Sequence, residues 1–255
     1  LLLPNGRRIF NVAIRTIQLY MGQAIYGVGG GITWDSTWES EYREVHQKAA
    51  VLYRKQARFQ LITTGKISQK QLLFEDQHLE RLTKASRYFA YPFDPEELRQ
   101  KIEEECRACD VNQDYRLRIT LSKSGEMELS RQILAPLSPS FCKAKLCLQE
   151  TDLNQSFTYF KTTHRPHLSL GEQEIIYHNA AGELLETSIG NLVLKINGKL
   201  YTPPIRLGIL PGIYRQHLLE TGQVKEKITT LEDLNQAEAI YGCNAVRGLY
   251  ELEVI

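Results

Sequence analysis

One stretch of the 255-residue chain, residues 186–215, constrains the fold more than any other, because its turn residues leave few alternatives. Residues 192–196 are typical of a short apolar strand. Asn197-Gly198 is the dipeptide that a two-residue hairpin turn prefers, since both central residues need positive φ. Residues 199–202 would return antiparallel until Pro203-Pro204 ends the pairing, because proline donates no backbone hydrogen bond.

A helix is expected after this hairpin. Pro211 stands at its start and Gly222 lies just past its end, which is the asymmetry typical of helix termini. The first N–H groups of a helix have no acceptor within it, so those of Gly212, Ile213 and Tyr214 would be free to bind a ligand. Such a helix start is a natural phosphate-binding site.

The same stretch resembles the cofactor site of the class IV pyridoxal-phosphate enzymes, which include branched-chain and D-amino-acid aminotransferases and 4-amino-4-deoxychorismate lyase. In that family a glutamate is followed five residues later by asparagine, and then by a hairpin, Thr-Pro and Leu-Pro-Gly-Ile. The corresponding positions are Glu186, Asn191, Thr202-Pro203 and residues 210–213. The resemblance implies a two-subdomain α+β fold of the D-amino-acid aminotransferase type, with pyridoxal 5′-phosphate as cofactor. It implies cofactor contacts from Glu186, Asn191, Gly212, Ile213 and Tyr214.

Other motifs match the same family. Residues 78–82 match its H-L-x-R-L motif, whose arginine, Arg81, binds the cofactor phosphate; a solvated surface arginine is the alternative interpretation. We expect Asp76 to cap the helix that carries Arg81. Lys161-Thr-Thr-His-Arg165, which should follow the apolar end of a strand, matches the motif of the lysine that bonds to the cofactor. Asn244 corresponds to the family's last phosphate-binding segment.

The chemistry of these side chains agrees with the resemblance. A buried lysine with a lowered pKa can bond to the cofactor aldehyde and later move a proton, so Lys161 is the predicted catalytic residue. A carboxylate beside the pyridine nitrogen, here Glu186, keeps that nitrogen protonated and makes the ring a better electron sink. Arg165 is a candidate ligand for a substrate carboxylate.

The class IV part divides in two. Residues 53–134 predict a small α/β subdomain and residues 141–255 a larger cofactor-binding subdomain, because residues 135–140 are typical of a linker, with two prolines and two serines. Residues 115–122 alternate between apolar and polar, which predicts a strand with one buried face. Arg116, Arg118 and Thr120 lie on the other face, where Arg118 could bind a substrate carboxylate or point to solvent.

Residues 1–52 resemble a different family, the chorismate-utilising synthases, and specifically the C-terminal end of aminodeoxychorismate synthase component I. The matching motifs are residues 13–16, the glycine-rich residues 27–31, and residues 36–44. Since the first residue is leucine and most of a synthase domain is missing, we expect a piece of a longer product without synthase turnover.

In the synthase family, the position of Arg15 meets a carboxylate of chorismate, and the positions of Glu41 and Glu44 hold Mg²⁺. Carboxylates about one helical turn apart face the same way, as metal binding needs. Mg²⁺ would bind here only if the missing synthase part were present. Asp35 or Ser36 is the expected cap of the helix that carries the two glutamates.

Composition excludes several functions. A net charge of +1 gives no basic field for nucleic acid, and no run is apolar enough to span a membrane.

Five cysteines suit reduced thiols, so a cytoplasmic location is expected. The spacings Cys106/Cys109 and Cys142/Cys147 would fit zinc, but we favour structural thiols, because Cys106 is in phase with the apolar face of a helix.

The two resemblances together predict the reaction. A segment similar to the enzyme that makes aminodeoxychorismate, joined to a class IV unit, indicates two consecutive steps toward p-aminobenzoate in folate biosynthesis. The predicted function is therefore that of 4-amino-4-deoxychorismate lyase, which eliminates pyruvate. The alternatives are a branched-chain or D-amino-acid aminotransferase and an inactive remnant that docks onto a synthase. The resemblances also imply a homodimer and, for a full-length fusion, a glutamine amidotransferase partner.

Overall fold

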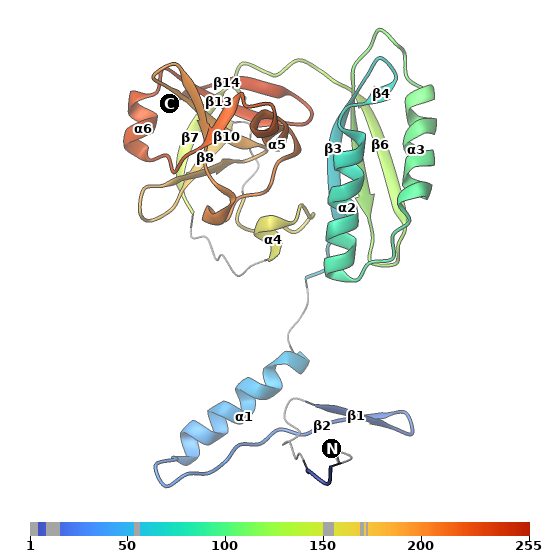
Figure 1. Ribbon diagram of the computed structural model, residues 1–255, viewed down its shortest axis with the longest axis vertical. Helices are drawn as coiled ribbons and strands as arrows, with labels where there is room; N and C mark the ends of the chain where they lie inside the picture. The colour runs from blue at the N-terminus through green and yellow to red at the C-terminus, as the bar shows by residue number, and fades with distance from the viewer. Residues whose placement is uncertain (1–4, 9–15, 54–56, 150–155, 169–170, 172) are drawn as a thin grey trace. The chain divides into compact units, whose positions relative to one another are not determined.

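The chain forms two units, residues 1–57 and 58–255 (Figure 1). The computed structural model describes residues 5–8, 16–53, 57–149, 156–168, 171 and 173–255, so the motif residue Arg15 lies outside the described residues. None of the helices in these ranges has the length and apolar character that crossing a membrane requires.

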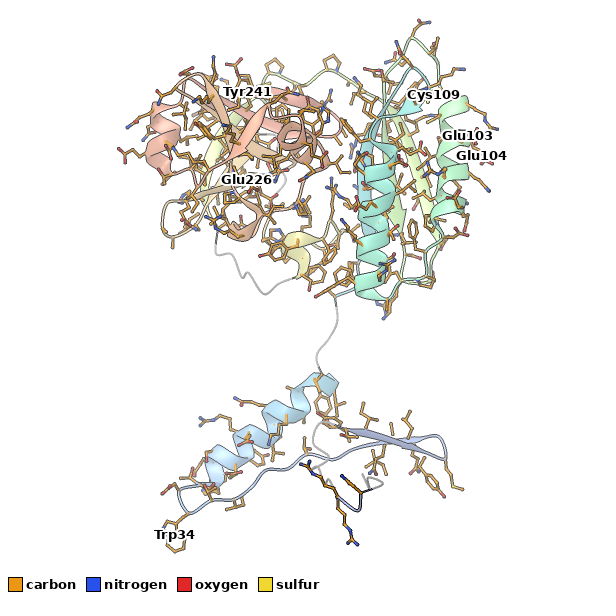
Figure 2. All side chains as sticks on the ribbon, viewed as in Figure 1. Trp34, Glu103, Glu104, Cys109, Glu226 and Tyr241 are labelled. Atoms are coloured by element: carbon orange, nitrogen blue, oxygen red, sulfur yellow. The ribbon has the colours of Figure 1, made fainter. Side chains whose placement is uncertain are left out.

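The first unit contains a hairpin and a helix. Strands β1 (Ile17–Tyr20) and β2 (Gln23–Tyr26) are joined at Met21-Gly22, where φ is 47° and 77°, and α1 spans Trp38–Tyr53. No residue of α1 is buried, and Trp34 is 100% exposed (Figure 2). The unit therefore shows no apolar core of its own in its described residues.

The predicted cap of α1 is wrong. Thr37 precedes the helix, and its hydroxyl accepts a hydrogen bond from the Ser40 N–H at 3.3 Å. The Ser36 hydroxyl is used differently, because it accepts from the Thr33 N–H at 3.0 Å and donates to Glu41 at 2.6 Å.

The second unit begins with a four-stranded antiparallel sheet in the order β4-β3-β5-β6. Buried apolar residues at odd positions of β3 and β5, such as Ile67 and Leu117, form one core with Leu82 and Ile102 of the helices. Since side chains alternate along a strand, the even positions of β3 and β5 face the other way. The elements are β3 (Leu61–Ser68), β4 (Gln71–Leu72), α2 (Glu75–Phe89), α3 (Pro95–Arg107), β5 (Tyr115–Leu121) and β6 (Met127–Ile133).

Asp76 does not cap α2, contrary to expectation. The residue before the helix is Phe74, in the left-handed region at φ 59°, and it forms no side-chain cap. Its ring packs against those of Tyr214 and His217, at centroid distances of 6.0 and 5.1 Å. Asp76 is the second residue of the helix and pairs with Arg99 instead.

The rest of the second unit is an eight-stranded sheet in the order β12-β11-β10-β13-β14-β7-β8-β9, which closes on itself because β9 also pairs with β10. The predicted hairpin between β10 and β11 is confirmed, with Asn197 and Gly198 at φ 50° and 70°. The strands are β7 (Lys143–Leu148), β8 (Glu174–His178), β9 (Leu184–Thr187), β10 (Asn191–Ile196), β11 (Lys199–Thr202), β12 (Val224–Glu226), β13 (Ala239–Asn244) and β14 (Gly248–Val254). Four short helices accompany them: α4 (Ser156–Tyr159), η1 (Ile205–Leu207), α5 (Ile213–Glu220) and α6 (Leu231–Gln236).

The residues before Lys161 form a helical turn, α4, and the predicted strand end is wrong. The turn gathers aromatic side chains against α2. The Phe160 ring stacks on Tyr88 at 4.5 Å, and the Phe157 ring meets Phe59 edge-on at 5.0 Å. An apolar run of this length suits a strand or a buried helical turn equally, and packing decides between them.

Gly65 permits the close approach of α2 to β3. A Cβ at this position would lie 2.6 Å from Nε2 of the buried His78 and 2.7 Å from Cδ1 of Leu72. We predict that Gly65→Ala lowers the free energy of unfolding by about 1–3 kcal/mol, the usual cost of overpacking. Urea denaturation measures this. Gly171→Ala, whose Cβ would have no neighbour closer than 3.9 Å, is the control, and equal losses in both variants would contradict the prediction.

Candidate active site

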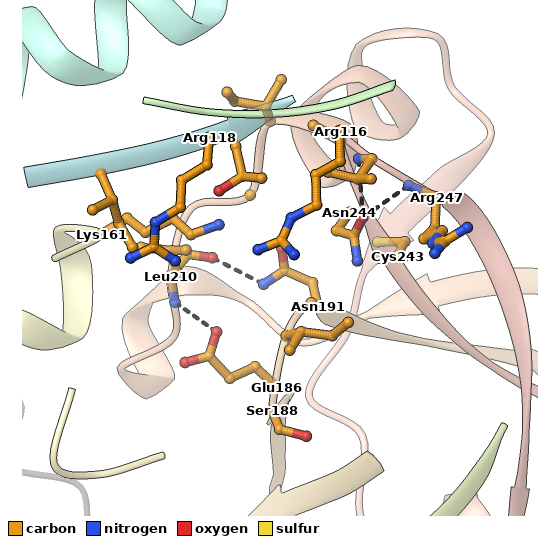
Figure 3. Close-up of a pocket in the computed structure, with 18 of the residues that line it drawn as sticks. Arg116, Arg118, Lys161, Glu186, Ser188, Asn191, Leu210, Cys243, Asn244 and Arg247 are labelled. Carbon is orange, nitrogen blue, oxygen red and sulfur yellow. Dashed lines mark hydrogen bonds between the residues drawn. The ribbon is translucent and has the colours of Figure 1, made fainter. Parts of the chain in front are cut away.

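A cavity of about 760 Å³ is lined by even-numbered residues of β3 and β5 and by one rim of the closed sheet (Figure 3). Tyr214 is not among its lining residues: its ring packs against Phe74 and His217, so only its backbone N–H can serve a ligand. The predicted site residues that the cavity brings together are Arg81, Arg118, Lys161, Arg165, Glu186, Asn191, Gly212, Ile213 and Asn244.

Strand pairing delivers Lys161 to this cavity. The Lys161 carbonyl accepts a hydrogen bond from the Ile62 N–H at 3.0 Å, and the Thr163 N–H donates to Gln60 O at 2.9 Å. Thr162 forms a bridge with Leu61 at the start of β3. The N-terminal part of this edge of β3 can pair with residues 161–163 because β4 pairs only with the C-terminal end of β3.

The Lys161 amine lies in surroundings that disfavour its charge. Burial lowers the pKa of Lys161 well below its usual value. Nearby guanidinium groups add to the effect, because a second positive charge raises the cost of protonation. These groups belong to Arg81, Arg165, Arg116 and Arg118. A neutral lysine amine is nucleophilic, as covalent catalysis needs.

Glu186 and Asn191 face each other across the β9–β10 pairing and hold the backbone of the same residue, Leu210. The Leu210 N–H donates to Glu186 Oε2 at 3.2 Å, and its carbonyl accepts from Asn191 Nδ2 at 2.9 Å. Arg165 Nη2 lies 3.4 Å from Glu186 Oε1. Burial raises the pKa of Glu186, while Arg165 and the Leu210 amide oppose that rise.

The peptide held in this way leads directly into α5. The first helical hydrogen bond runs from Gln216 N–H to Gly212 O, so the N–H groups of Ile213 and Tyr214 have no acceptor within the helix. Arg81 Nη2 donates to Pro211 O at 2.7 Å, which brings a guanidinium to the same helix start. Burial, with Arg165 nearby, lowers the pKa of Arg81 to about 10, so it stays charged at neutral pH.

His78, the first residue of the H-L-x-R-L motif, is a neighbour of the site for which the motif predicted no role. It is fully buried, and its Nδ1 lies 2.6 Å from Thr63 Oγ1. Burial, with smaller effects from Arg81 and Lys161, lowers its pKa to about 3, so the imidazole is neutral at neutral pH. Because His78 precedes Arg81 by three residues, the two side chains lie about one helical turn apart, and this spacing could have indicated that His78 is a neighbour of the site.

A buried carboxylate supports the turn between Glu186 and Asn191. The Ser188 hydroxyl accepts from the Ile175 N–H at 3.0 Å, so its single proton is directed at Glu174 Oε1, 2.5 Å away. The Ile189 N–H donates to the same oxygen at 3.1 Å. The Tyr250 hydroxyl donates to the other Glu174 oxygen, also at 3.1 Å. These bonds fix the turn that sets the spacing of the two site residues.

The side chain of Asn244 organises its own loop. Its Oδ1 accepts hydrogen bonds from the N–H groups of Val246 and Arg247, both at 2.9 Å. A role for Asn244 toward a phosphate stays a prediction.

The carboxylates of Glu41 and Glu44 have protein partners in the first unit. Glu41 accepts from Ser36, and Glu44 forms an ion pair with Lys48 at 2.5 Å. The Lys48 ammonium also donates to Gly29 O at 2.8 Å, so a cation of the protein lies beside the pair. The expected Mg²⁺ role stays a prediction for a longer protein.

The cysteines are free thiols in the described part of the chain, where no group of three or more metal-binding side chains gathers. Burial raises the pKa of Cys106 to about 11, which opposes the thiolate that zinc would need.

Two family models match the sequence. The model of amino-transferase class IV covers residues 60–255, and that of chorismate binding enzyme covers residues 1–54. The chain belongs to the class IV aminotransferase family. Its second unit is therefore an enzyme unit of that family, with the mixed helix-and-strand fold that the sequence predicted.

Three relatives illustrate the range of this class IV family. A Schizosaccharomyces pombe protein named as a candidate aminodeoxychorismate lyase is 25% identical over 194 residues, covering 69% of this chain and 82% of the relative. A solved Mesorhizobium loti structure, titled as a candidate amino-acid aminotransferase, is 27% identical with a TM-score of 0.69, covering 77% and 100%. A Haemophilus somnus structure titled as a candidate 4-amino-4-deoxychorismate lyase is 25% identical with a TM-score of 0.60, covering 76% and 100%.

The class IV site fits pyridoxal phosphate. It combines a buried amine of lowered pKa, a buried carboxylate, and a helix start beside a guanidinium, within a cavity of the size typical for cofactors. A Mycobacterium tuberculosis aminotransferase structure titled as the PLP-bound form shares the fold, at 16% identity and a TM-score of 0.64.

The lowered pKa of Lys161 predicts a pH-dependent stability. Between that pKa and about 10.4 the unfolded chain binds more protons than the folded one, so Lys161 contributes a stability that rises with pH. In cofactor-free protein, Lys161→Met should be more stable than wild type at neutral pH, and the difference should shrink toward pH 10. Urea denaturation at several pH values measures this. Lys199→Met, at the exposed first position of β11, is the control, and a constant difference for Lys161→Met would contradict the prediction.

The carboxylate under the turn predicts a second effect. Glu174→Leu removes the acceptor of two buried hydroxyl donors, Ser188 and Tyr250, and of the partly buried Ile189 N–H, and should cost at least about 2 kcal/mol of unfolding free energy. It should also weaken pyridoxal-phosphate binding, measured by absorbance titration, whereas Glu174→Gln keeps an acceptor and should lose less. Leu252→Ala, in the same core, should lower stability without changing cofactor affinity. Equal cofactor affinity in Glu174→Leu and wild type would contradict the role of the turn.

Proposed function

We propose that this chain is a pyridoxal-phosphate-dependent 4-amino-4-deoxychorismate lyase. The observation that carries the proposal is the union, in one chain, of a segment matching chorismate binding enzymes with a class IV unit. A chorismate-type reaction that supplies an amino product, followed by a class IV reaction that consumes it, explains why the two are joined. The lyase names of two relatives support the same reaction.

Each side chain of the site has a place in this reaction. When bound, pyridoxal phosphate supplies an aldehyde that bonds to amines and a ring that accepts electron density. Arg81 and the N–H groups of Ile213 and Tyr214 would hold its phosphate, and Glu186 would hold a proton at the ring nitrogen. Arg165 contacts Glu186 and so orients that carboxylate.

The elimination needs one proton carrier. Lys161 Nζ, neutral because of its burial, takes the proton from the substrate carbon that bears the amine. The carbon–oxygen bond of the enolpyruvyl ether breaks, and its electron pair leaves with enolpyruvate. The proton returns to the methylene carbon of enolpyruvate, which gives pyruvate. The substrate ring becomes aromatic p-aminobenzoate, and no oxidant or reductant is consumed.

A second candidate is an aminotransferase for branched-chain or D-amino acids. The similarity to the Mesorhizobium loti structure, at 27% identity, favours it. The same Lys161 and Glu186 would serve both reactions, so the substrate decides between them. A docking remnant without activity is the third interpretation. The homodimer, the cytoplasmic location, the glutamine amidotransferase partner and the boundary residues 135–140 stay predictions.

A direct assay separates these functions. We predict that the protein loaded with pyridoxal phosphate releases pyruvate from aminodeoxychorismate, measured with lactate dehydrogenase, and that Lys161→Ala lowers the rate at least about 100-fold, because general acid–base catalysis supplies that much. Borohydride should fix the cofactor to wild type and not to Lys161→Ala, as mass spectrometry shows.

Keto-acid-dependent amino transfer without pyruvate release would favour the aminotransferase. Absence of a visible cofactor band in wild type would favour the remnant. Lys84→Ala, on the exposed side of α2, is the matched control and should keep full activity.

A further inference from the structure

Two arginines of β5 point into the cavity although neither has a carboxylate partner among the described residues. Arg116 and Arg118 alternate with the buried Leu117 and Ile119, so both lie on the face of β5 that is turned away from the helices. Figure 3 shows their guanidinium groups directed into the cavity, and both line it.

A third arginine with no acidic partner in the part of the chain that the structure describes comes from the loop between β13 and β14. The Arg247 N–H is bound to Asn244 Oδ1, and Gly248 turns the chain at φ 70°, so the base of the Arg247 side chain is fixed. Arg247 lies on the far side of Arg116 from Lys161 in Figure 3. Burial and the neighbouring Arg116 lower the pKa of Arg247, which shows that the two guanidinium groups repel each other.

Several buried or partly buried arginines of the described chain do have acidic partners. Arg131, Arg165 and Arg215 each form an ion pair with a glutamate, and so do the exposed Arg99 and Arg107. Placing like charges together without an anion is unfavourable. The missing carboxylate therefore has to come with a ligand.

The charges around the cavity indicate how many anionic groups that ligand carries. The described lining residues include six cationic side chains and one carboxylate, Glu186. If Lys161 is left out of the count, because burial lowers its pKa well below the usual value, five guanidinium groups face one carboxylate and the excess is four positive charges. A cofactor phosphate brings about two negative charges. About two positive charges remain for the substrate. An amine with two carboxylates would neutralise both, whereas a monocarboxylate would leave one positive charge without an anion.

We propose that Arg116 and Arg247 form a subsite for the second carboxylate of a dicarboxylate substrate, while Arg118, nearer Lys161, is left for the first. This inference rests on the proposed function, because aminodeoxychorismate carries a ring carboxylate and an enolpyruvyl carboxylate. The subsite makes the two arginines determinants of specificity. Branched-chain amino acids have no second carboxylate that could bind to this subsite.

Binding of a matched pair of probes tests the subsite without turnover. Calorimetry on protein loaded with pyridoxal phosphate compares 3-(carboxymethoxy)benzoate, a dianion, with 3-methoxybenzoate, a monoanion. We expect wild type to bind the dianion at least about tenfold more tightly, since a charge-assisted contact contributes that much. Arg116→Gln and Arg247→Gln should each reduce this ratio, and the double variant should bring it near one. Arg87→Gln, which removes the same charge from an exposed position, is the control and should leave the ratio unchanged.

The Michaelis constant for aminodeoxychorismate provides the second readout. It should rise at least about tenfold in Arg116→Gln and Arg247→Gln while the affinity for pyridoxal phosphate stays within about twofold. An unchanged probe ratio and Michaelis constant in both variants, with wild type active, would overturn the subsite and leave the proposed function standing. A different outcome would support the subsite and overturn the lyase assignment: the wild type releases no pyruvate, yet it prefers the dianion, and both variants lose that preference.

Discussion

The site depends on two hydrogen bonds to the backbone of one residue, because Glu186 accepts from the Leu210 N–H and Asn191 donates to the Leu210 carbonyl. Those two side chains come together only because β9 pairs with β10 and closes the sheet. The held peptide in turn places the start of α5 beside Arg81. The closed sheet, the Glu186 carboxylate and the start of α5 are thus parts of one arrangement, and displacing any of them would shift the others.

Electrostatics give this arrangement its chemical character. One face of the β3–β5 layer packs on helices, and the other presents guanidinium groups to the space that contains the Lys161 amine. Burial, together with their combined positive potential, lowers the pKa of that amine. The same potential attracts anions, so the features that make the lysine reactive also select the molecules that can reach it.

Local chemistry made part of this structure predictable from sequence. Asn197-Gly198 forms the expected turn because its requirement for positive φ is satisfied within two residues. Arg81, Lys161 and Glu186 could be grouped through the family motif, and they line one cavity. The failures involve tertiary packing: α4 replaces a strand because Phe160 and Phe157 find aromatic partners, and Phe74, not Asp76, precedes α2. Alternation placed Arg116 beside Arg118, but no local signal identified Arg247 as a third member of the group.

The bridge between Thr162 and Leu61 has a consequence for how the two halves of the second unit cooperate. The reactive lysine belongs by covalent connection to the C-terminal half, yet its backbone is registered by the N-terminal half. A protease cut within residues 135–140 would therefore leave two fragments still held together by backbone hydrogen bonds at the reactive residue. Any shift of one half relative to the other would displace the Lys161 amine first, so the reactivity of that amine would report on the alignment of the two halves.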